Sequence, residues 1–297
     1  MIMQDTRNYQ IIFLASFFFL GICTRDWTLQ PWLIIAIALS CLITQWLLSS
    51  IVESAKRKDE LFFSLSSDTE SKFILKDLIV SSTSPKVLNS LRSAAITALG
   101  LCLLLRGNSY QTMILAGSLA IASKFLFRWH GKHFFNPANF GIIAALILTN
   151  DAWVSPGQWG TDWWYLLLFA GTGGIVLKKV GRWDTSAAFF LTYASLELLR
   201  DVWLGWTGDV WLHQLSSGSL LLFALFMLTD PRSIPNAFAG RLVWAIAIAF
   251  LTFVLQNYFY LSTAIFWALF IISPLTVLLD MAWSAPRFTW KRNLVNG

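Results

Sequence analysis

Polar and ionisable side chains gather in three short segments of this chain, each lying between long apolar runs. The segments are HGKHFFNPANFG at 130–141, GRWDTS at 181–186 and TDPRSIPNAFAG at 229–240. Ionisable groups at membrane depth are costly, so by default they mark functional sites. Their amide, hydroxyl and carboxylate groups suit hydrogen bonds to a ligand, and we assign no catalytic residue. We therefore predict a binding site, with any redox chemistry supplied by a bound cofactor.

The first and third segments resemble each other. Each places Asn, Pro and Gly just before an apolar run, since NPANFG precedes IIAALIL and PNAFAG precedes RLVWAIAIAF. Asn is a good helix N-cap and Pro is tolerated in the first turn, so both helices should begin sharply. Broken helices of this kind bind polar ligands in transporters built from internal repeats. The alternative is a pair of ordinary, well-capped loops.

Composition indicates which elements must position these segments. Of the 297 residues, 56% are hydrophobic and 13% are charged, and the mean hydropathy is +0.61. An average soluble protein has about 25% charged residues, so we exclude a soluble domain. The apolar runs recur at roughly the 20 residues that cross a bilayer. We predict an all-α fold, a polytopic transmembrane helix bundle in which 1–297 form one integral membrane domain.

Ten helical spans account for the apolar runs, and several of them are short or broken. The run at 138–150 is close to a half-helix, and Pro274 predicts a kink in the last run. An internal repeat is a further expectation, although a simple inverted repeat would put its two similar segments on opposite sides. We expect helices near 9–24, 31–52, 88–105, 110–127, 138–150, 163–178, 185–204, 214–229, 238–256 and 260–279.

Basic residues predict the orientation. With the N-terminus inside, the outer segments hold only Arg25, Arg106 and Arg200 of the 22 Lys and Arg. Cytoplasmic loops carry such an excess, so we expect both termini inside a bacterial cytoplasmic (inner) membrane. Residues 53–87 are then a cytoplasmic loop and 280–297 a cytoplasmic tail. The net charge of +6 has the same explanation, and we expect the lipid bilayer, not nucleic acid, as a partner.

Other reactive residues have plainer interpretations. His130 and His133 have a spacing that suits a metal or a haem, but no second ligand is expected on another helix, so we interpret them as loop anchors. Glu197 is expected to pair with Arg200 at i+3. The cysteines lack CxxC spacing and are interpreted as buried, small apolar residues: Cys23, Cys41 and Cys102.

The order of the three segments resembles the RnfD/NqrB family. FNPANFG comes first, a G-x-x-D-T-S element follows at 181–186, and FMLTDP stands at 226–231. Family members carry FNPA, G-x-x-G-E-T-S-like and ATDP elements in this order on a ten-helix fold. They are membrane subunits of the Rnf electron-transport complex and of the sodium-pumping NADH:quinone reductase. The resemblance covers roughly residues 85–280.

The resemblance implies flavin chemistry. Family members attach FMN covalently to the Thr of a Ser-Gly-Ala-Thr motif in an outer loop, and one branch also holds riboflavin. Here the corresponding loop, 151–162, lacks that motif, and its one Thr, Thr161, follows Gly160. We therefore favour non-covalent binding of a flavin (FMN or riboflavin) or a quinone over covalent FMN at Thr161. The site residues that the resemblance implies are Asn136, Pro137, Asn139, Asp184, Thr185, Ser186, Thr229 and Asp230.

Three functions stay open. The first is an electron-transport subunit, an oxidoreductase component without independent activity, that binds flavin or quinone and works with partner subunits. The second is a membrane transporter that kept the scaffold and lost the redox centre, because a fold does not fix a function. The third is an accessory membrane protein, since stand-alone RnfD-like proteins of this length are known. The missing attachment motif favours a stand-alone member.

Overall fold

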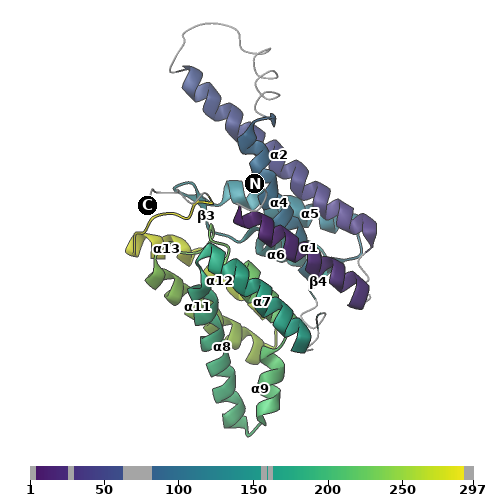
Figure 1. Cartoon of the computed structure of the whole chain (residues 1–297), viewed down its shortest axis with the longest axis vertical. Helices are drawn as coiled ribbons and strands as arrows, with labels where there is room; N and C mark the ends of the chain where they lie inside the picture. The colour runs from purple at the N-terminus through teal and green to yellow at the C-terminus, as the bar shows by residue number, and fades with distance from the viewer. Residues whose placement is uncertain (1–4, 26–29, 63–81, 155–158, 160–162, 291–297) are drawn as a thin grey trace.

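A computed structural model describes residues 5–25, 30–62, 82–154, 159 and 163–290, and these form a helical bundle (Figure 1). The N-terminal helices are α1 (Thr6–Arg25), α2 (Pro31–Phe62), α4 (Pro85–Leu104), α5 (Tyr110–Leu126) and α6 (Pro137–Leu148). The C-terminal helices are α7 (Trp163–Val180), α8 (Trp183–Leu204), α9 (Gly208–Leu215), α10 (Gly218–Leu222), the π-helix η2 (Phe223–Met227), α11 (Phe238–Asn257), α12 (Ala264–Ile272) and α13 (Leu275–Ala282).

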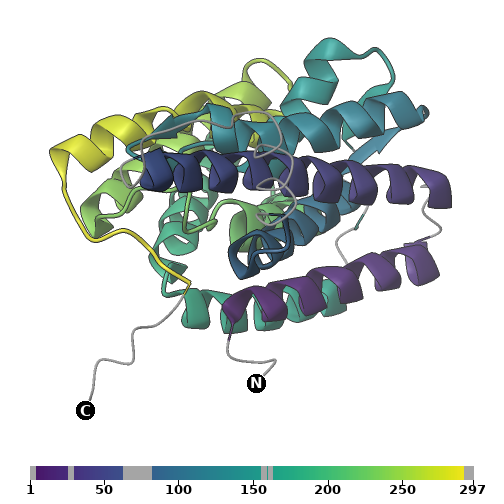
Figure 2. The same ribbon diagram turned by 90° about the horizontal axis from the view of Figure 1, so that it is seen from above.

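The two sets of helices form two neighbouring groups along the long axis of the molecule, as Figures 1 and 2 show. Within the first group α2 packs against α4 and α5, and α5 packs against α6. Within the second group α8 packs against α11, and α11 against α12. Contacts of α6 with α12 and of α1 with α7 join the groups.

Two short antiparallel ladders connect helix ends. Strand β1 (Leu105–Gly107) pairs with β4 (Ala152–Val154), so the end of α4 is tied to the chain that follows α6. Strand β2 (Arg128–Trp129) pairs with β3 (Lys132–His133) in a hairpin that precedes α6. His130 and Gly131 form its turn with φ of 48° and 80°, which is the left-handed region that hairpin turns require.

Most predicted helices lie at the observed positions, including the short one now seen as α6. The kink at Pro274 is confirmed, because α12 and α13 meet at a bend of 47°. The single helix expected at 214–229 is wrong: the chain forms α9, α10 and η2 there, with a bend of 48° between Gly208–Leu215 and Gly218–Met227. Of the loop expected at 53–87, residues 53–62 are instead the end of α2, and 63–81 lie outside the described residues.

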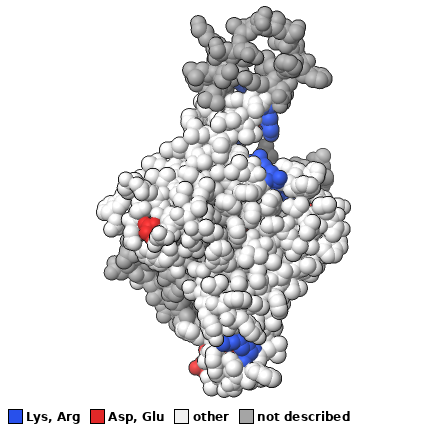
Figure 3. All heavy atoms as spheres, turned by 180° about the vertical axis from the view of Figure 1, so that it is seen from behind, with Lys and Arg blue, Asp and Glu red and all other residues white. Residues whose placement is uncertain are grey.

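Four of the described helices are long and apolar enough to cross a membrane by length and composition, and six segments qualify if each bent pair is one span. Large apolar side chains are exposed along α2, as expected for contact with lipid: Trp32, Ile35, Leu39, Ile43, Trp46 and Ile51. Figure 3 shows a face with few charged atoms, as a bilayer requires. The count of ten spans and the side on which the termini lie stay predictions.

Glycines bring three helices of the first group into backbone contact. A Cβ atom on Gly141 of α6 would lie 2.6 Å from the carbonyl oxygen of Ala116 in α5. A Cβ atom on Gly117 of α5 would lie 3.3 Å from the carbonyl oxygen of Ile37 in α2. Small residues permit such close approach in membrane bundles. The α2–α5–α6 layer is therefore packed without intervening side chains at these points.

Candidate functional site

The three polar segments meet at the π-helix η2. Leu228 N donates to Phe223 O at 2.8 Å, the i to i−5 bond that defines a π-turn. Ser186 Oγ donates to the carbonyl oxygen of Ala224 at 2.6 Å, and Asn136 Nδ2 donates to the carbonyl oxygen of Met227 at 2.9 Å. The first and second segments thus bind the irregular helix from which the third segment leads out.

The FNPA segment begins α6 as expected. Asn136 is the N-cap, its Oδ1 accepts from Asn139 N at 3.0 Å, and Pro137 is the first helical residue. Asn139 is fully buried, and its Nδ2 donates to the carbonyl oxygen of Phe266 in α12 at 3.1 Å. Its Oδ1 has no hydrogen-bond partner among the described residues. Both Asn side chains therefore face the bundle, as predicted, and Asn139 retains one free acceptor.

The DTS segment opens α8 with a buried ion pair. Asp184 Oδ2 accepts from Arg241 Nε of α11 at 2.6 Å, and both side chains are largely inaccessible to solvent. Arg241 Nη1 also donates to the carbonyl oxygen of Asn236 at 2.6 Å, so the pair joins the second and third segments. Thr185 is fully buried and its Oγ1 has no hydrogen-bond partner among the described residues.

The TDP segment carries the second charged contact of the site. Thr229 Oγ1 donates to the carbonyl oxygen of Leu225 at 2.8 Å, a contact within its own helical end. Asp230 Oδ2 lies 3.8 Å from His133 Nε2. Burial lowers the pKa of His133, although the Asp230 carboxylate favours its charged form. Burial alone would raise the pKa of Asp230, but His133 and the amide of Arg232 outweigh it, so the pKa lies below its usual value.

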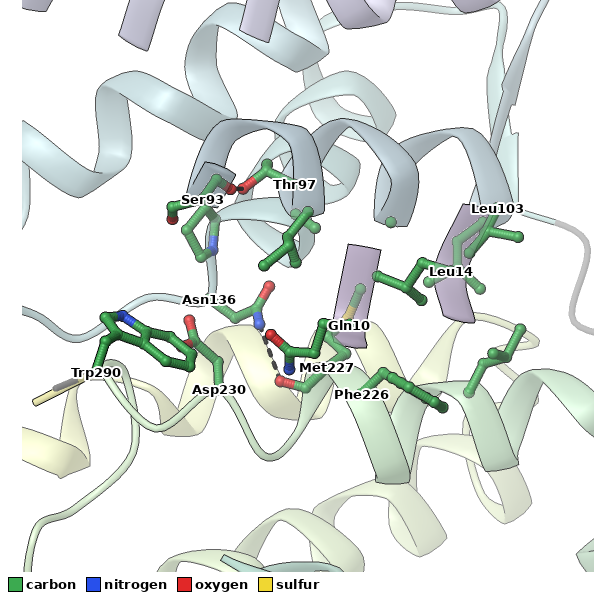
Figure 4. A pocket seen from close by; sticks show the side chains of 16 residues that line it. Gln10, Leu14, Ser93, Thr97, Leu103, Asn136, Phe226, Met227, Asp230 and Trp290 are labelled. Carbon is green, nitrogen blue, oxygen red and sulfur yellow. Dashed lines mark hydrogen bonds between the residues drawn. The ribbon is translucent and has the colours of Figure 1, made fainter. Parts of the chain in front are cut away.

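A small cavity adjoins these segments, between the two helix groups. Its volume is about 80 Å³. Figure 4 shows Asn136 and Asp230 with Gln10 of α1, Ser93 and Thr97 of α4, and Trp290 around it, together with Leu14, Leu103, Phe226 and Met227. Of the residues predicted to bind a cofactor, the cavity brings together Asn136, Pro137 and Asp230. Asn139, Asp184, Thr185, Ser186 and Thr229 do not line it.

Lys124 of α5 is a buried charge that the sequence interpretation missed. Its Nζ donates to Thr97 Oγ1 at 3.0 Å and to Ser93 Oγ at 3.3 Å, behind the two hydroxyl groups that line the cavity. No carboxylate of the described residues lies within 4 Å of this ammonium group. Its position in the last turn of an apolar helix resembled an ordinary cytoplasmic anchor. A signal was present, since Ser93 and Thr97 lie one turn apart on α4.

Several interpretations of single residues change. Lys132 does anchor its loop, because Nζ bonds Asp280 Oδ2 and the carbonyl oxygen of Ile234, each at 2.6 Å. Glu197 does not pair with Arg200 but accepts from Asn257 Nδ2 at 2.8 Å. Arg200 lies instead 3.7 Å from Asp201. Of the cysteines, Cys41 and Cys102 are buried as predicted, whereas Cys23 is exposed.

Comparison with known proteins bears on this arrangement. Residues 148–289 match the family described as "NQR2, RnfD, RnfE family", a stretch that contains the second and third segments. The chain is a relative of RnfD. The RnfD resemblance predicted from motif order is thereby confirmed, although the FNPA segment lies upstream of the matched residues.

Curated relatives carry the RnfD name as well, each being the RnfD component of an ion-translocating oxidoreductase complex. The chain is 31% identical over 115 residues to the protein from Stutzerimonas stutzeri, covering 39% of this chain and 32% of that protein. It is 32% identical over 124 residues to the protein from Halorhodospira halophila, covering 41% and 34%. The protein from Actinobacillus pleuropneumoniae is 29% identical over 104 residues, covering 34% and 30%. The chain thus spans about a third of the length of these RnfD relatives.

Proposed function

We propose that this chain is a membrane subunit of RnfD type that works with partner subunits in electron transport. The observation that carries the proposal is the match of residues 148–289 to the family, in a chain of apolar helices. The relatives are named as one subunit of an ion-translocating oxidoreductase complex, which implies other subunits in their case. A multi-pass position in a bacterial inner membrane is part of the same proposal.

The cavity beside the three segments does not fit a flavin in its present form. An engineered cavity of about 150 Å³ holds benzene, whereas this one has about 80 Å³. The three fused rings of a flavin, or the substituted ring of a quinone, would need its walls to separate. We propose that such a ligand binds here only after α1 or the segment around Trp290 has moved. Free acceptors on Asn139 and Thr185 lie close in sequence to the site but do not line the cavity.

Covalent FMN at Thr161 stays a prediction. Thr161 and its neighbours 155–158, 160 and 162 lie outside the described residues. The chain lacks Ser-Gly-Ala before this Thr, which favours a stand-alone member without covalent flavin.

A second function, transport or an accessory role on the retained scaffold, is favoured by one observation. The polar side chains of the motif segments bind protein groups: Asn136 and Ser186 bind backbone carbonyls, and Asp184 binds Arg241. Such bonds stabilise an irregular bundle without any cofactor. In this case the three segments hold the fold together, and the ligand of the cavity is small.

Visible absorption of the purified protein, before and after acid precipitation, separates these functions. Flavin absorbance that stays with the pellet in the parent and is lost in Thr161→Ala would establish covalent attachment. Flavin released into solution would support a non-covalent site. A folded, colourless protein that also fails to bind added quinone would contradict the electron-transport proposal and leave transport or an accessory role. Co-purification of redox subunits tests the partner proposal separately.

A further inference from the structure

A larger pocket lies at the end of the second helix group that is opposite the three segments. Its volume is about 490 Å³, within the range of about 300–1,000 Å³ typical of small-molecule sites. It forms where the middle of α8, the break between α9 and α10, the end of α11 and the start of α12 meet. Most of its lining residues carry a hydroxyl or an amide: Tyr193, Gln214, Ser217, Ser219, Gln256, Tyr260 and Ser262.

The lining of this polar pocket is uncharged. Among the described residues that form it, no Lys, Arg, His, Asp or Glu is present, and the others are Leu220, Leu261 and Ile265. A charged ligand would lose hydration without gaining a counter-charge. A purely apolar ligand would leave the hydroxyl and amide groups without hydrogen bonds, which costs free energy for each buried group. The pocket therefore selects for a neutral, hydrogen-bonding molecule.

Two buried groups in the pocket lack partners. Ser219 is 1% exposed, and its Oγ has no hydrogen bond among the described residues. The buried Oε1 atom of Gln214 also has none. Across the pocket, Tyr193 OH donates to Gln256 Oε1 at 3.0 Å, which orients the amide of Gln256. A ligand that both donates and accepts hydrogen bonds at neighbouring atoms would satisfy these groups together.

Tyr260 supplies an aromatic ring at the mouth. Its side chain is 84% exposed, and its backbone φ is +55°. A bulky residue with positive φ is an outlier, and such strain clusters at ligand sites. The C–H faces of sugar rings pack against aromatic rings, while their hydroxyl groups both donate and accept. A ring next to uncharged hydroxyl and amide groups is the combination that recognises such a molecule.

We propose that the polar pocket binds a neutral, polyhydroxylated group, of the class of a monosaccharide or polyol. Ser219 and Gln214 hydrogen-bond its hydroxyl groups, and Tyr260 packs against it. Such a group reaches the pocket either as a free solute or as the glycosyl head of a membrane lipid. The site is separate from the cavity beside Asn136, so it holds whether or not that cavity binds a redox cofactor.

Saturation-transfer NMR on the full-length protein tests the proposal. The protein is held in a zwitterionic detergent, because alkyl glycoside detergents carry the proposed ligand class. Methyl α-glucoside and sorbitol are the free probes, and monoglucosyl diacylglycerol in nanodiscs is the lipid probe. We expect transfer to at least one probe. The variants Ser219→Ala and Gln214→Met should each weaken its binding about fivefold, as expected for one lost hydrogen bond.

Ser216→Ala is the matched control, because Ser216 Oγ bonds the carbonyl oxygen of His213 outside the pocket. It should bind as the parent does. Circular dichroism and elution volume confirm that each variant is folded, and Tyr260→Ala provides a third variant at the exposed mouth. Transfer only to the lipid probe identifies a glycolipid head, and transfer to the free probes identifies a solute. No transfer to any probe by the folded parent, or transfer that none of the three variants weakens, would mean water alone fills the pocket and would overturn the proposal.

Discussion

The side-chain amide of Asn136 donates a 2.9 Å hydrogen bond to the carbonyl oxygen of Met227, across 91 residues of sequence. The same side chain accepts from Asn139 N at 3.0 Å and so caps α6. One buried residue therefore fixes both the start of a helix in the first group and the end of η2 in the second. The two motif segments that resemble each other in sequence are joined directly at this point.

Replacement of Asn136 should destabilise the bundle. Asn136→Ala removes the helix cap and the bond to Met227, and together these losses should cost about 2 kcal/mol of unfolding free energy. Asn136→Asp keeps the acceptor for Asn139 N but loses the amide donor, so it distinguishes the two contributions. Unfolding in mixed micelles with increasing denaturing detergent measures the cost. Asn108→Ala, at an exposed position, is the control. An Asn136→Ala protein as stable as this control would contradict the role of the side chain.

The Asp184–Arg241 pair should show strong coupling. Removal of one partner leaves a buried charge unpaired, which typically costs about 3–5 kcal/mol. We expect Asp184→Leu and Arg241→Met each to lower stability by this order, and the double variant to recover much of the loss. A double-mutant cycle on unfolding measures the coupling free energy. Additive single effects would show that the 2.6 Å contact contributes little.

His133 should make stability dependent on pH near neutrality. Its pKa is lowered in the fold, chiefly by burial, from about 6.5 in an unfolded chain. The unfolded state then binds more protons than the fold as the pH falls below about 6.5, so stability decreases in this direction. Asp230, whose pKa is also lowered, adds a loss only near and below about pH 4. Lys124 and Arg232 lie nearby and keep the site positive.

Thermal midpoints measured in detergent between pH 7.5 and 5.5 check this dependence. The parent should lose stability over the interval, and His133→Gln, which cannot be protonated there, should lose less. Equal slopes for both proteins would exclude His133 as the source.

Glycine substitutions in two helices should have opposite effects. Gly141→Ala places a Cβ atom 2.6 Å from a backbone oxygen of α5, and such overpacking typically costs about 1–3 kcal/mol. Gly174→Ala in α7 meets nothing within 4 Å, and Ala should stabilise a helix interior there by about 0.5–1 kcal/mol. Both variants are compared by thermal unfolding in one detergent. A neutral Gly141→Ala would mean that α5 and α6 can separate freely.

The sequence predicted the helices well and the joints between them poorly. Apolar run lengths place α1, α5, α6 and α11 closely, because each is a continuous hydrophobic stretch. The three pieces between Gly208 and Met227 could not be read from composition, since a π-turn depends on which carbonyls neighbouring side chains satisfy. The motif segments were identified by their polar residues.

The partners of those motif residues were not predictable from one sequence. The bonds of Asn136 to Met227 and of Asp184 to Arg241 link residues 91 and 57 positions apart, so they depend on helix packing. Lys124 was missed for the same reason, because only the fold shows that Ser93 and Thr97 shield it from lipid and solvent. The cavity volume likewise follows from how closely α1 approaches α4.

The glycine contact between α5 and α6 also limits how the bundle responds to a larger guest. With Gly141 already at backbone contact, α6 cannot withdraw from the cavity toward α5. Room must come from α1, which Asp5 ties to Arg92 at 3.1 Å at one end and Thr24 ties to Tyr165 at the other. Entry of a ring-sized molecule then waits for a whole helix to shift, a motion on the order of microseconds to milliseconds. Binding at this site should accordingly be slow to begin and slow to reverse.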